Sequence, residues 1–151
     1  PPNLNHQAVS ATLHGRIWNH LQQHPIGKVY SAPLDVVFSH FDVVEPDLLF
    51  VSHARRDVLT SKNVQGAPDL VVEIGSPSTR RRDEKLKHQL YERFEVTEYW
   101  VVDPDVDVVR VYRLVEGKYQ RAQELSLDHG DVLTTPLLPG LDLKLSEIFA
   151  E

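Results

Sequence analysis

The chain opens with an amphipathic pattern over residues 6–24. Apolar residues recur there at every fourth position: Val9, Leu13, Ile17 and Leu21. This spacing predicts a helix with one buried face. We expect Asn5 to cap its start and Pro25 with Gly27 to end it. Gly15 is the one residue that opposes this helix, and the apolar stripe outweighs it.

Segments rich in Val, Leu, Phe and Tyr follow this helix and predict two neighbouring strands. They cover residues 28–39 and 43–51, and the short polar link between them favours antiparallel pairing. Residues 52–68 are polar and charged without a period. They predict a surface loop or a short helix around residues 55–59.

A compact strand is predicted at residues 69–74, and a second helix follows it. Residues 75–78, with the sequence Gly-Ser-Pro-Ser, break the strand. The helix is therefore expected to begin at residue 79 or 83 and to end at residue 94. Its buried face is predicted to consist of three residues, Leu86, Leu90 and Phe94.

The remainder of the chain predicts mainly strands. Residues 99–103, 106–115 and 119–127 are typical of a meander with an acidic turn at residues 103–105, and residues 146–149 predict a short closing helix. The order of elements predicts an α/β fold in which a mixed β-sheet is flanked by α-helices. We expect one domain over residues 1–151.

Composition and charge narrow the functions that the chain can have. It has 151 residues with no Cys, which excludes disulfides, thiolate nucleophiles and sulfur-ligated zinc. The net charge of -6 excludes a histone-like coating of nucleic acid, so contact with DNA requires local basic residues.

The ends and the hydropathy of the chain give two further expectations. No apolar run is long enough to span a bilayer and no secretory signal opens the sequence, so we expect a cytoplasmic protein. The chain begins Pro1-Pro2-Asn3 without Met, so we expect that a natural N-terminal segment is missing.

Two of the predicted strands carry acidic residues on faces that are otherwise apolar. Asp47 shares a face with Leu49 and Val51, and Glu73 shares a face with Val71. A carboxylate in such a place is costly unless a cation, a metal ion or hydrogen bonds compensate it. The alternative is that these acids lie at strand ends in water or pair with arginines. Their occurrence on two strands favours convergence on a positive group.

The second predicted helix brings basic residues into an acidic chain. Four of them are candidate nucleic-acid contacts: Arg80, Arg81, Arg82 and Lys85. The alternative for such a cluster is a solvated helix face.

Lys87 of the same helix is the candidate partner of the two acids. It follows Leu86 of the expected buried face, so it should project from the flank where the helix meets the sheet. Asp83 and Tyr91 stand one turn before and one turn after it and are candidate supporting residues.

Two carboxylates, a divalent ion and a lysine form a complete site for hydrolysing a phosphodiester. Asp47 and Glu73 would hold Mg²⁺ or Mn²⁺, because these ions prefer hard oxygen ligands. Lys87 would orient the nucleophile or stabilise the charge on the phosphate. Asp69 or Asp83 would support the site from outside.

Several short motifs occur along the chain in a fixed order: Pro46-Asp47, Pro68-Asp69-Leu70-Val71-Val72-Glu73-Ile74, Ser76-Pro77-Ser78-Thr79, Asp83 to Lys87 with Tyr91, Glu98-Tyr99-Trp100-Val101-Val102-Asp103-Pro104, and Pro139-Gly140-Leu141. In this order and spacing they resemble the Uma-two family of putative restriction endonucleases, within the PD-(D/E)xK nuclease superfamily. The resemblance spans nearly the whole chain. It implies a restriction-endonuclease-like core and a metal-dependent endonuclease acting on DNA, with Asp47 as the first acid of the pattern and Glu73 as the second.

The chain departs from the superfamily pattern at the lysine. The pattern would place a lysine where Gly75 stands, and Lys87 fits the position to which the lysine of this family has moved. The resemblance also implies a strand pair with a glutamate ahead of residues 1–24. His6 opens the first helix where the family tends to carry a histidine, which makes it a candidate supporting residue. Its alternative is a partly exposed surface histidine.

The remaining candidates have weaker signals. His20 and His24 have the spacing of a zinc-binding helix but lack its glutamate, so we expect them to be exposed. Trp18, Trp100 and the tyrosines are predicted to fill the core and interfaces rather than to stack on bases.

A different class of function stays open beside the nuclease. Net negative charge and Gly75 favour a non-enzymatic domain that keeps the nuclease scaffold as a DNA-binding or assembly module. A homodimer through residues 106–127 is also expected, because a two-fold nuclease meets both strands of a duplex.

Overall fold

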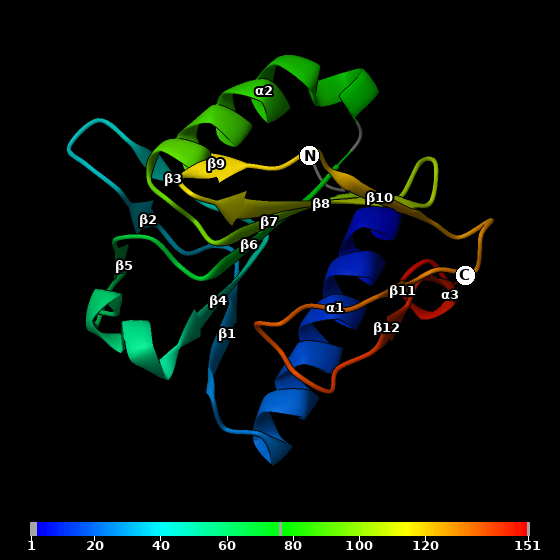
Figure 1. Ribbon diagram of the computed structural model, residues 1–151, viewed down its shortest axis with the longest axis horizontal. Helices are drawn as coiled ribbons and strands as arrows, with labels where there is room; N and C mark the ends of the chain where they lie inside the picture. Colours follow the sequence, from blue (N-terminus) through cyan, green and yellow to red (C-terminus); the bar gives the residue numbers. More distant parts are fainter. Residues whose placement is uncertain (1–2, 76, 151) are drawn as a thin grey trace.

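A mixed β-sheet with helices on both of its faces forms the centre of the structure (Figure 1). This computed structural model describes residues 3–75 and 77–150, with the backbone alone from 77 to 82. The seven strands of the sheet, in spatial order, are β1 (Gly27–Ser31), β4 (Leu48–Ser52), β6 (Leu70–Ile74), β7 (Glu98–Asp103), β8 (Val108–Val115) and β10 (Gln123–Ser126), with β9 (Lys118–Tyr119) also paired to β8. Only β6 and β7 run parallel within this sheet. The expected α/β class with a mixed, helix-flanked sheet is confirmed.

The structure also contains two small sheets and a 3₁₀ helix. Their elements are β2 (Val36–Val37), β3 (Val43–Val44), β5 (Val64–Gln65), β11 (Val132–Leu133), β12 (Leu143–Lys144) and the helix η1 (His53–Val58). The two long strands predicted at 28–39 and 43–51 are each divided between the large sheet and a small one. Pro33 and Pro46 lie at the two breaks, where a residue without a backbone N–H cannot continue a ladder. The predicted antiparallel pairing holds for β1 with β4 and for β2 with β3.

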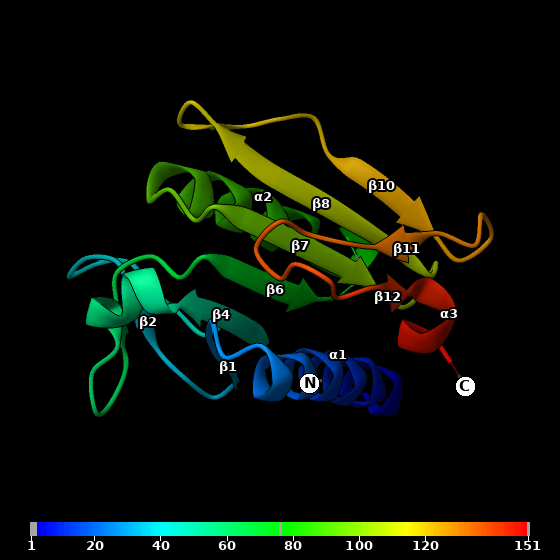
Figure 2. The same cartoon turned by 60° about the horizontal axis from the view of Figure 1, so that its bottom comes forward.

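Helix α1 (Leu4–Gln23) covers one face of the large sheet, together with the short α3 (Leu145–Ile148) (Figure 2). Its predicted stripe is confirmed, since all four residues are buried in the main core: Val9, Leu13, Ile17 and Leu21. The cap is Asn3 rather than Asn5, because the Asn3 side chain accepts a 2.8 Å hydrogen bond from the His6 backbone N–H.

Helix α2 (Pro77–Arg93) crosses the opposite face and connects the parallel strands β6 and β7. The prediction of Leu86 as a buried residue is wrong, since it is 57% exposed. The inner face carries the half-buried Lys87 and His88 and the fully buried Tyr91 instead. The apolar periodicity does not identify the inner face of α2, because the face that this helix turns to the sheet is largely polar.

Two further expectations about single residues are corrected by burial. Trp100 is fully buried as predicted, but Trp18 on α1 is 50% exposed. His20 is half-buried with its ring 4.6 Å from that of His24, and only His24 is exposed. Within the described residues, none of the helices has the length and apolar character needed to cross a bilayer.

Replacing Gly15 by Ala should stabilise the protein, because Gly15 lies inside α1 and an added Cβ would meet nothing within 4 Å. The expected gain is about 0.5–1 kcal/mol, which corresponds to a rise in Tm of roughly 1–4 °C. Thermal unfolding followed by circular dichroism measures it. Gly27→Ala is the control and should lower Tm, because its Cβ would collide with the Val51 carbonyl oxygen. An unchanged Tm in the Gly15 variant would contradict the expectation.

Candidate active site

The antiparallel strands β4 and β6 bring the two predicted acids to the same end of the sheet. Asp47 immediately precedes β4, and Glu73 is the last residue but one of β6. The backbone N–H of Ile74 donates a 2.7 Å hydrogen bond to Asp47 Oδ2. This bond ties the carboxylate of Asp47 to the end of the strand that carries Glu73.

Asp69 makes the same kind of bond at the opposite end of this strand pair. Its Oδ2 accepts a 2.6 Å hydrogen bond from the backbone N–H of Ser52, the last residue of β4. Asp69 precedes Glu73 by four residues, or roughly 13 Å along an extended strand. The structure therefore does not bring Asp69 together with the other candidate residues, and its visible role is to hold β4 against β6.

The sequence contains a signal for these paired bonds that the hydrophobic pattern does not reveal. The same three residues lead into both strands, Pro46-Asp47-Leu48 into β4 and Pro68-Asp69-Leu70 into β6. Each aspartate accepts the backbone N–H at the end of the neighbouring strand. The repeated tripeptide thus identifies two aspartates that hold β4 and β6 together, one at each end of the strand pair.

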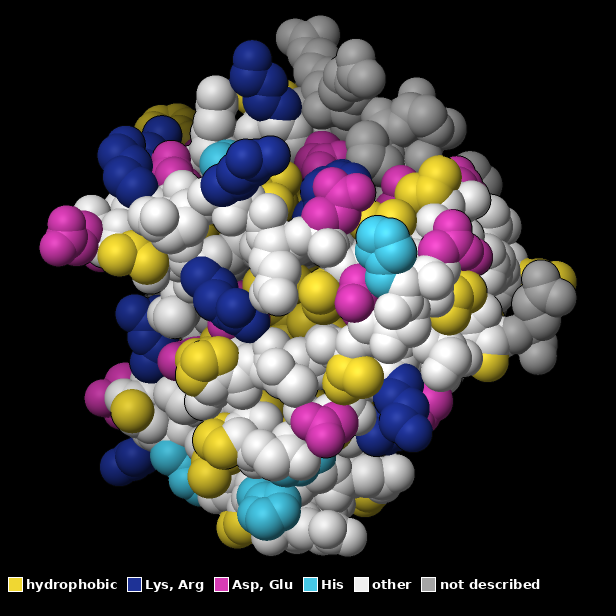
Figure 3. Space-filling model, turned by 45° about the vertical axis from the view of Figure 1, so that its right-hand side comes forward, with side chains coloured by type: hydrophobic (Ala, Val, Ile, Leu, Met, Phe, Trp, Pro, Cys, Tyr) yellow, Lys and Arg dark blue, Asp and Glu magenta, His cyan; other side chains and the backbone are white. Residues whose placement is uncertain are grey.

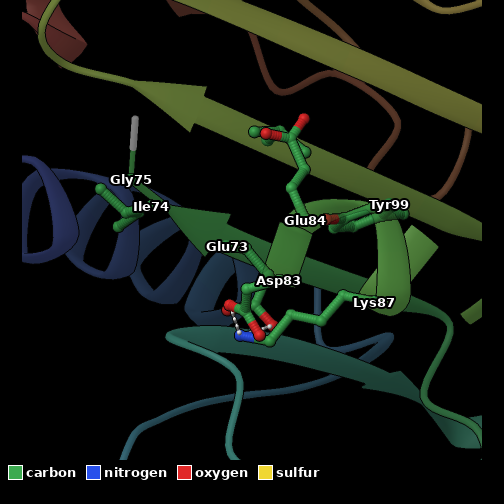
Figure 4. A pocket seen from close by; sticks show the side chains of 8 residues that line it. Glu73, Ile74, Gly75, Asp83, Glu84, Lys87 and Tyr99 are labelled. Carbon is green, nitrogen blue, oxygen red and sulfur yellow. Dashed lines mark ion pairs between the residues drawn. The ribbon is translucent and has the colours of Figure 1, made fainter. Parts of the chain in front are cut away.

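Glu73 is buried under α2, where two side chains of that helix contact its carboxylate. Tyr91 donates its hydroxyl to Glu73 Oε2 at 2.6 Å, and Lys87 Nζ lies 3.1 Å from the same oxygen. Lys87 Nζ also lies 3.5 Å from Asp83 Oδ2, so the ammonium is held between two carboxylates (Figure 4). Lys87, Asp83 and Tyr91 stand on successive turns of α2, as the sequence predicted.

Burial raises the pKa of the Glu73 carboxyl, because a carboxylate loses its hydration there. The ammonium of Lys87 and the hydroxyl of Tyr91 oppose this shift, and the charge of Asp47 adds to it. Burial and the neighbouring Glu73 also raise the pKa of Tyr91 far above its ordinary range. Tyr91 therefore keeps its proton and stays a hydrogen-bond donor to Glu73.

His6 completes the environment of Asp47 from the first turn of α1. Its Nε2 lies 3.4 Å from Asp47 Oδ1, and its side chain is only 17% exposed. One oxygen of Asp47 thus faces the Ile74 N–H and the other faces His6. The structure brings His6 to the acids from a distant part of the chain.

The basic residues predicted to contact nucleic acid are placed only in part. Lys85 is exposed on α2. The side chains of Arg80, Arg81 and Arg82 lie outside the described residues.

A small cavity of about 20 Å³ opens beside Glu73 and Lys87, with Gly75 in its wall. This space suits about one water molecule. Because Gly75 has no side chain, the place that the superfamily pattern gives to a lysine is filled by nothing larger than backbone. The ammonium of Lys87 is instead delivered from the helix above.

The donor set at this site fits a hard divalent cation better than zinc. Mg²⁺ binds commonly through one or two carboxylates and keeps several waters, which Asp47 and Glu73 could provide. A structural or catalytic zinc site uses three or four protein ligands. Among residues 3–75 and 83–150, whose side chains are described, no group of three or more His, Asp or Glu is arranged to hold a metal ion.

The fold agrees with comparisons to known proteins. A family model described as Uma2, putative restriction endonuclease, matches residues 1–146. The chain belongs to this family. Proteins of restriction-endonuclease-like families generally use divalent metal ions and act on DNA.

A solved structure supports the same fold. It is a crystal structure of "a putative nuclease belonging to DUF820" from Anabaena variabilis, with a TM-score of 0.81 and 19% sequence identity. The match covers 99% of this chain and 82% of that chain. At this identity the likeness shows the fold alone, which is the restriction-endonuclease-like fold expected from the sequence. The search of curated proteins finds no match.

Glu73→Gln should change how stability depends on pH. Because burial raises the pKa of Glu73, the folded state holds this proton more tightly than the unfolded state does. The contribution of Glu73 to the free energy of unfolding therefore falls as the pH rises from the unfolded pKa, near 4.5, through the raised folded value. Glutamine does not ionise. The stability of the variant relative to the wild type should increase across that pH window and then level off, as urea unfolding at a series of pH values would measure. A difference that is the same at every pH would contradict this expectation.

Proposed function

We propose that this protein hydrolyses phosphodiester bonds in DNA with Mg²⁺ or Mn²⁺, as an endonuclease. One observation carries the proposal: Lys87 contacts the buried Glu73, and Asp47 accepts the backbone N–H of Ile74, the residue that follows Glu73. Two acids and an ammonium from three separate elements thus meet at one end of the sheet. Membership of the Uma2 family supports DNA as the substrate.

Asp47 and Glu73 would hold the cation in this proposal. When bound, the ion would make a water more acidic and neutralise charge on the phosphate. Asp47 is oriented for this task by the Ile74 N–H and by His6, and Glu73 is oriented by Tyr91. Fixed acids need no rearrangement before they act, which is the advantage of a preorganised site.

Lys87 would supply the positive charge that stabilises the phosphate oxygens. Its side chain is 18% exposed and lines the cavity beside Glu73. Asp83 contacts the same ammonium from the outer side and is itself half-exposed, so it limits where Lys87 can move. A lysine on the helix can reach the point that a lysine at position 75 would occupy, because its side chain is long and flexible.

Positive charge for DNA must be local, as the net charge of -6 requires. Figure 3 shows Lys and Arg scattered among Asp and Glu on the face that it draws, without a continuous basic surface. The exposed Lys85 and the basic stretch Arg80 to Arg82 at the start of α2 are our proposed contacts to the phosphate backbone. We also propose a homodimer through residues 106–127, where β10 ends the strand order of the sheet.

Lys87→Ala and Asp47→Asn should each reduce DNA cleavage by roughly 100-fold or more, because the first removes the charge proposed to stabilise the phosphate and the second weakens a proposed ligand of the cation. Cleavage of plasmid and of single-stranded DNA with Mg²⁺ or Mn²⁺ measures this loss. Asp69→Asn is the matched control, since it makes the same exchange at the other end of the same strand pair. It should cut like the wild type. Equal activity in all four proteins would refute the assigned roles.

A second candidate is an inactive nuclease-fold module that binds DNA or assists assembly. Gly75 in place of the lysine and the lack of a three-ligand group among the described side chains favour it. Metal binding separates this candidate from the enzyme without any need for a known substrate.

Mn²⁺ should raise the Tm of the wild type, because an ion that binds only the folded state stabilises it by about 2.7 kcal/mol at 100 times its Kd. Thermal melts at increasing Mn²⁺ concentration measure the shift. Glu73→Gln removes one proposed ligand and should abolish most of it. A wild type that shows no shift but retains DNA in a salt-sensitive manner would favour the inactive module.

A further inference from the structure

Two hollows lie one after the other between α1 and the β1 segment, and together they are called the groove here. Figures 1 and 2 show α1 beside β1, the outermost strand of the large sheet. The first hollow has a volume of about 350 Å³ and is lined by Asp47, His6, His14 and Ser31, among others. The second has a volume of about 390 Å³ and is lined by Trp18, Lys28, Tyr30 and His53, among others.

One side of α1 forms the wall of both hollows. The contributing residues follow each other at steps of three or four: Gln7, Ala11, His14, Trp18 and Gln22. Since α1 has 20 residues, it is about 30 Å long, and the groove accompanies most of that length. At a rise of roughly 3.4 Å per stacked nucleotide, such a groove can hold several nucleotides.

The groove begins at the proposed active site. Asp47 lines its first hollow, and His6, which contacts Asp47, lines it as well. A chain that lies in the groove would therefore lead directly to the acids.

The charge of the groove contrasts with that of the whole molecule. Among the residues that line the two hollows, Lys28 is the one Lys or Arg. Asp47, at the catalytic end, is the only acid in this lining. The lining is therefore less acidic than the molecule as a whole, which carries a net charge of -6.

Trp18 gives the groove its second distinctive property. Half of this large aromatic side chain is exposed, although the sequence pattern predicts it in the core. An exposed indole beside a lysine is the combination with which proteins bind single-stranded nucleic acid, because a base of any kind can stack on it. The bases of a duplex are already stacked and paired, so they do not offer this contact.

We propose that this groove binds a single-stranded segment of DNA next to the bond to be cut, with Trp18 stacked on an unpaired base and Lys28 near the phosphate backbone. The proposal rests on the proposed nuclease function and specifies its substrate. A peptide that adds a strand to the edge of β1 is the competing occupant. The continuity with Asp47 and the shortage of acids in the lining favour DNA.

Fluorescence tests the proposal directly, because the chain has two tryptophans and Trp100 is fully buried. The probes are a 12-nucleotide oligothymidylate and a 12-base-pair duplex, both in EDTA so that no cleavage occurs. The single strand should quench the emission of the wild type, and the duplex should do so only at much higher concentration. Trp18→Phe keeps a ring for stacking but should lose the quenching signal.

Fluorescence anisotropy of the same oligonucleotide, carrying a label, measures how much Trp18 and Lys28 contribute to the affinity. Trp18→Ala should weaken binding roughly 5- to 100-fold, the range that one base stack provides. Lys28→Ala should reduce the slope of log K against log salt by about 0.7, the value for one phosphate contact on a single strand. Phe41→Ala and Lys144→Ala are the matched controls, since both side chains are exposed away from the groove. They should bind like the wild type.

The outcomes separate this proposal from the nuclease function. If Trp18→Ala binds the single strand as tightly as the wild type, or if the duplex quenches equally well, the groove proposal is wrong, whether or not the protein cuts DNA. If the Trp18 effect is present but no divalent ion supports cleavage by the wild type, the groove stands as a binding site and the nuclease function fails.

Discussion

The structure depends on keeping one carboxylate, that of Glu73, between the sheet and a helix. A buried charge of this kind is tolerated only when hydrogen bonds and an opposite charge compensate it. Tyr91 and Lys87 supply both, and they require α2 to present polar groups where a helix normally presents apolar ones. Ion pairs at the margins help to hold the helix, with Glu84 bound to Arg110 of β8 at 2.5 Å and Arg93 bound to Asp42 at 2.7 Å. The helix is thus attached by charge pairs in addition to the burial of Tyr91.

The fold could be predicted from the sequence wherever a buried surface is purely apolar. The stripe of α1 and the strands β6 and β7 were predicted for this reason, and so was the α/β class. On α2 the helix itself was predicted, but Leu86 of its predicted buried face is exposed, because a periodicity of Leu and Phe identifies the inner face only when that face is apolar. The inner position belongs to Lys87 and not to Leu86, and nothing in the local sequence distinguishes the two. Local rules tend to fail at sites of this kind, where function competes with packing.

The candidate site, too, could be predicted from the sequence only in part. Asp47 and Glu73 stand out in the sequence because a period of two places acids on apolar faces. Lys87 could be selected from its place beside the expected buried face, and the family resemblance agreed with that choice. The contact between His6 and Asp47 joins segments that no periodicity relates. Asp69 was expected to support the site from outside, but it lies at the opposite end of the strand pair, although its immediate sequence is the same as that of Asp47. The surroundings that separate them come from other parts of the chain.

The register of β4 and β6 gives this strand pair a local twofold axis. The axis passes through the pair Leu49 and Val71, and it relates Asp47 to Asp69 and Ile74 to Ser52. Under the same operation Glu73 corresponds to Val51, a buried apolar residue. The two ends of the ladder therefore share one backbone design and differ in whether a second carboxylate stands beside the aspartate. The far end therefore serves as an internal comparison for the site: it has the same contact between aspartate and backbone, with Val51 in the place of Glu73.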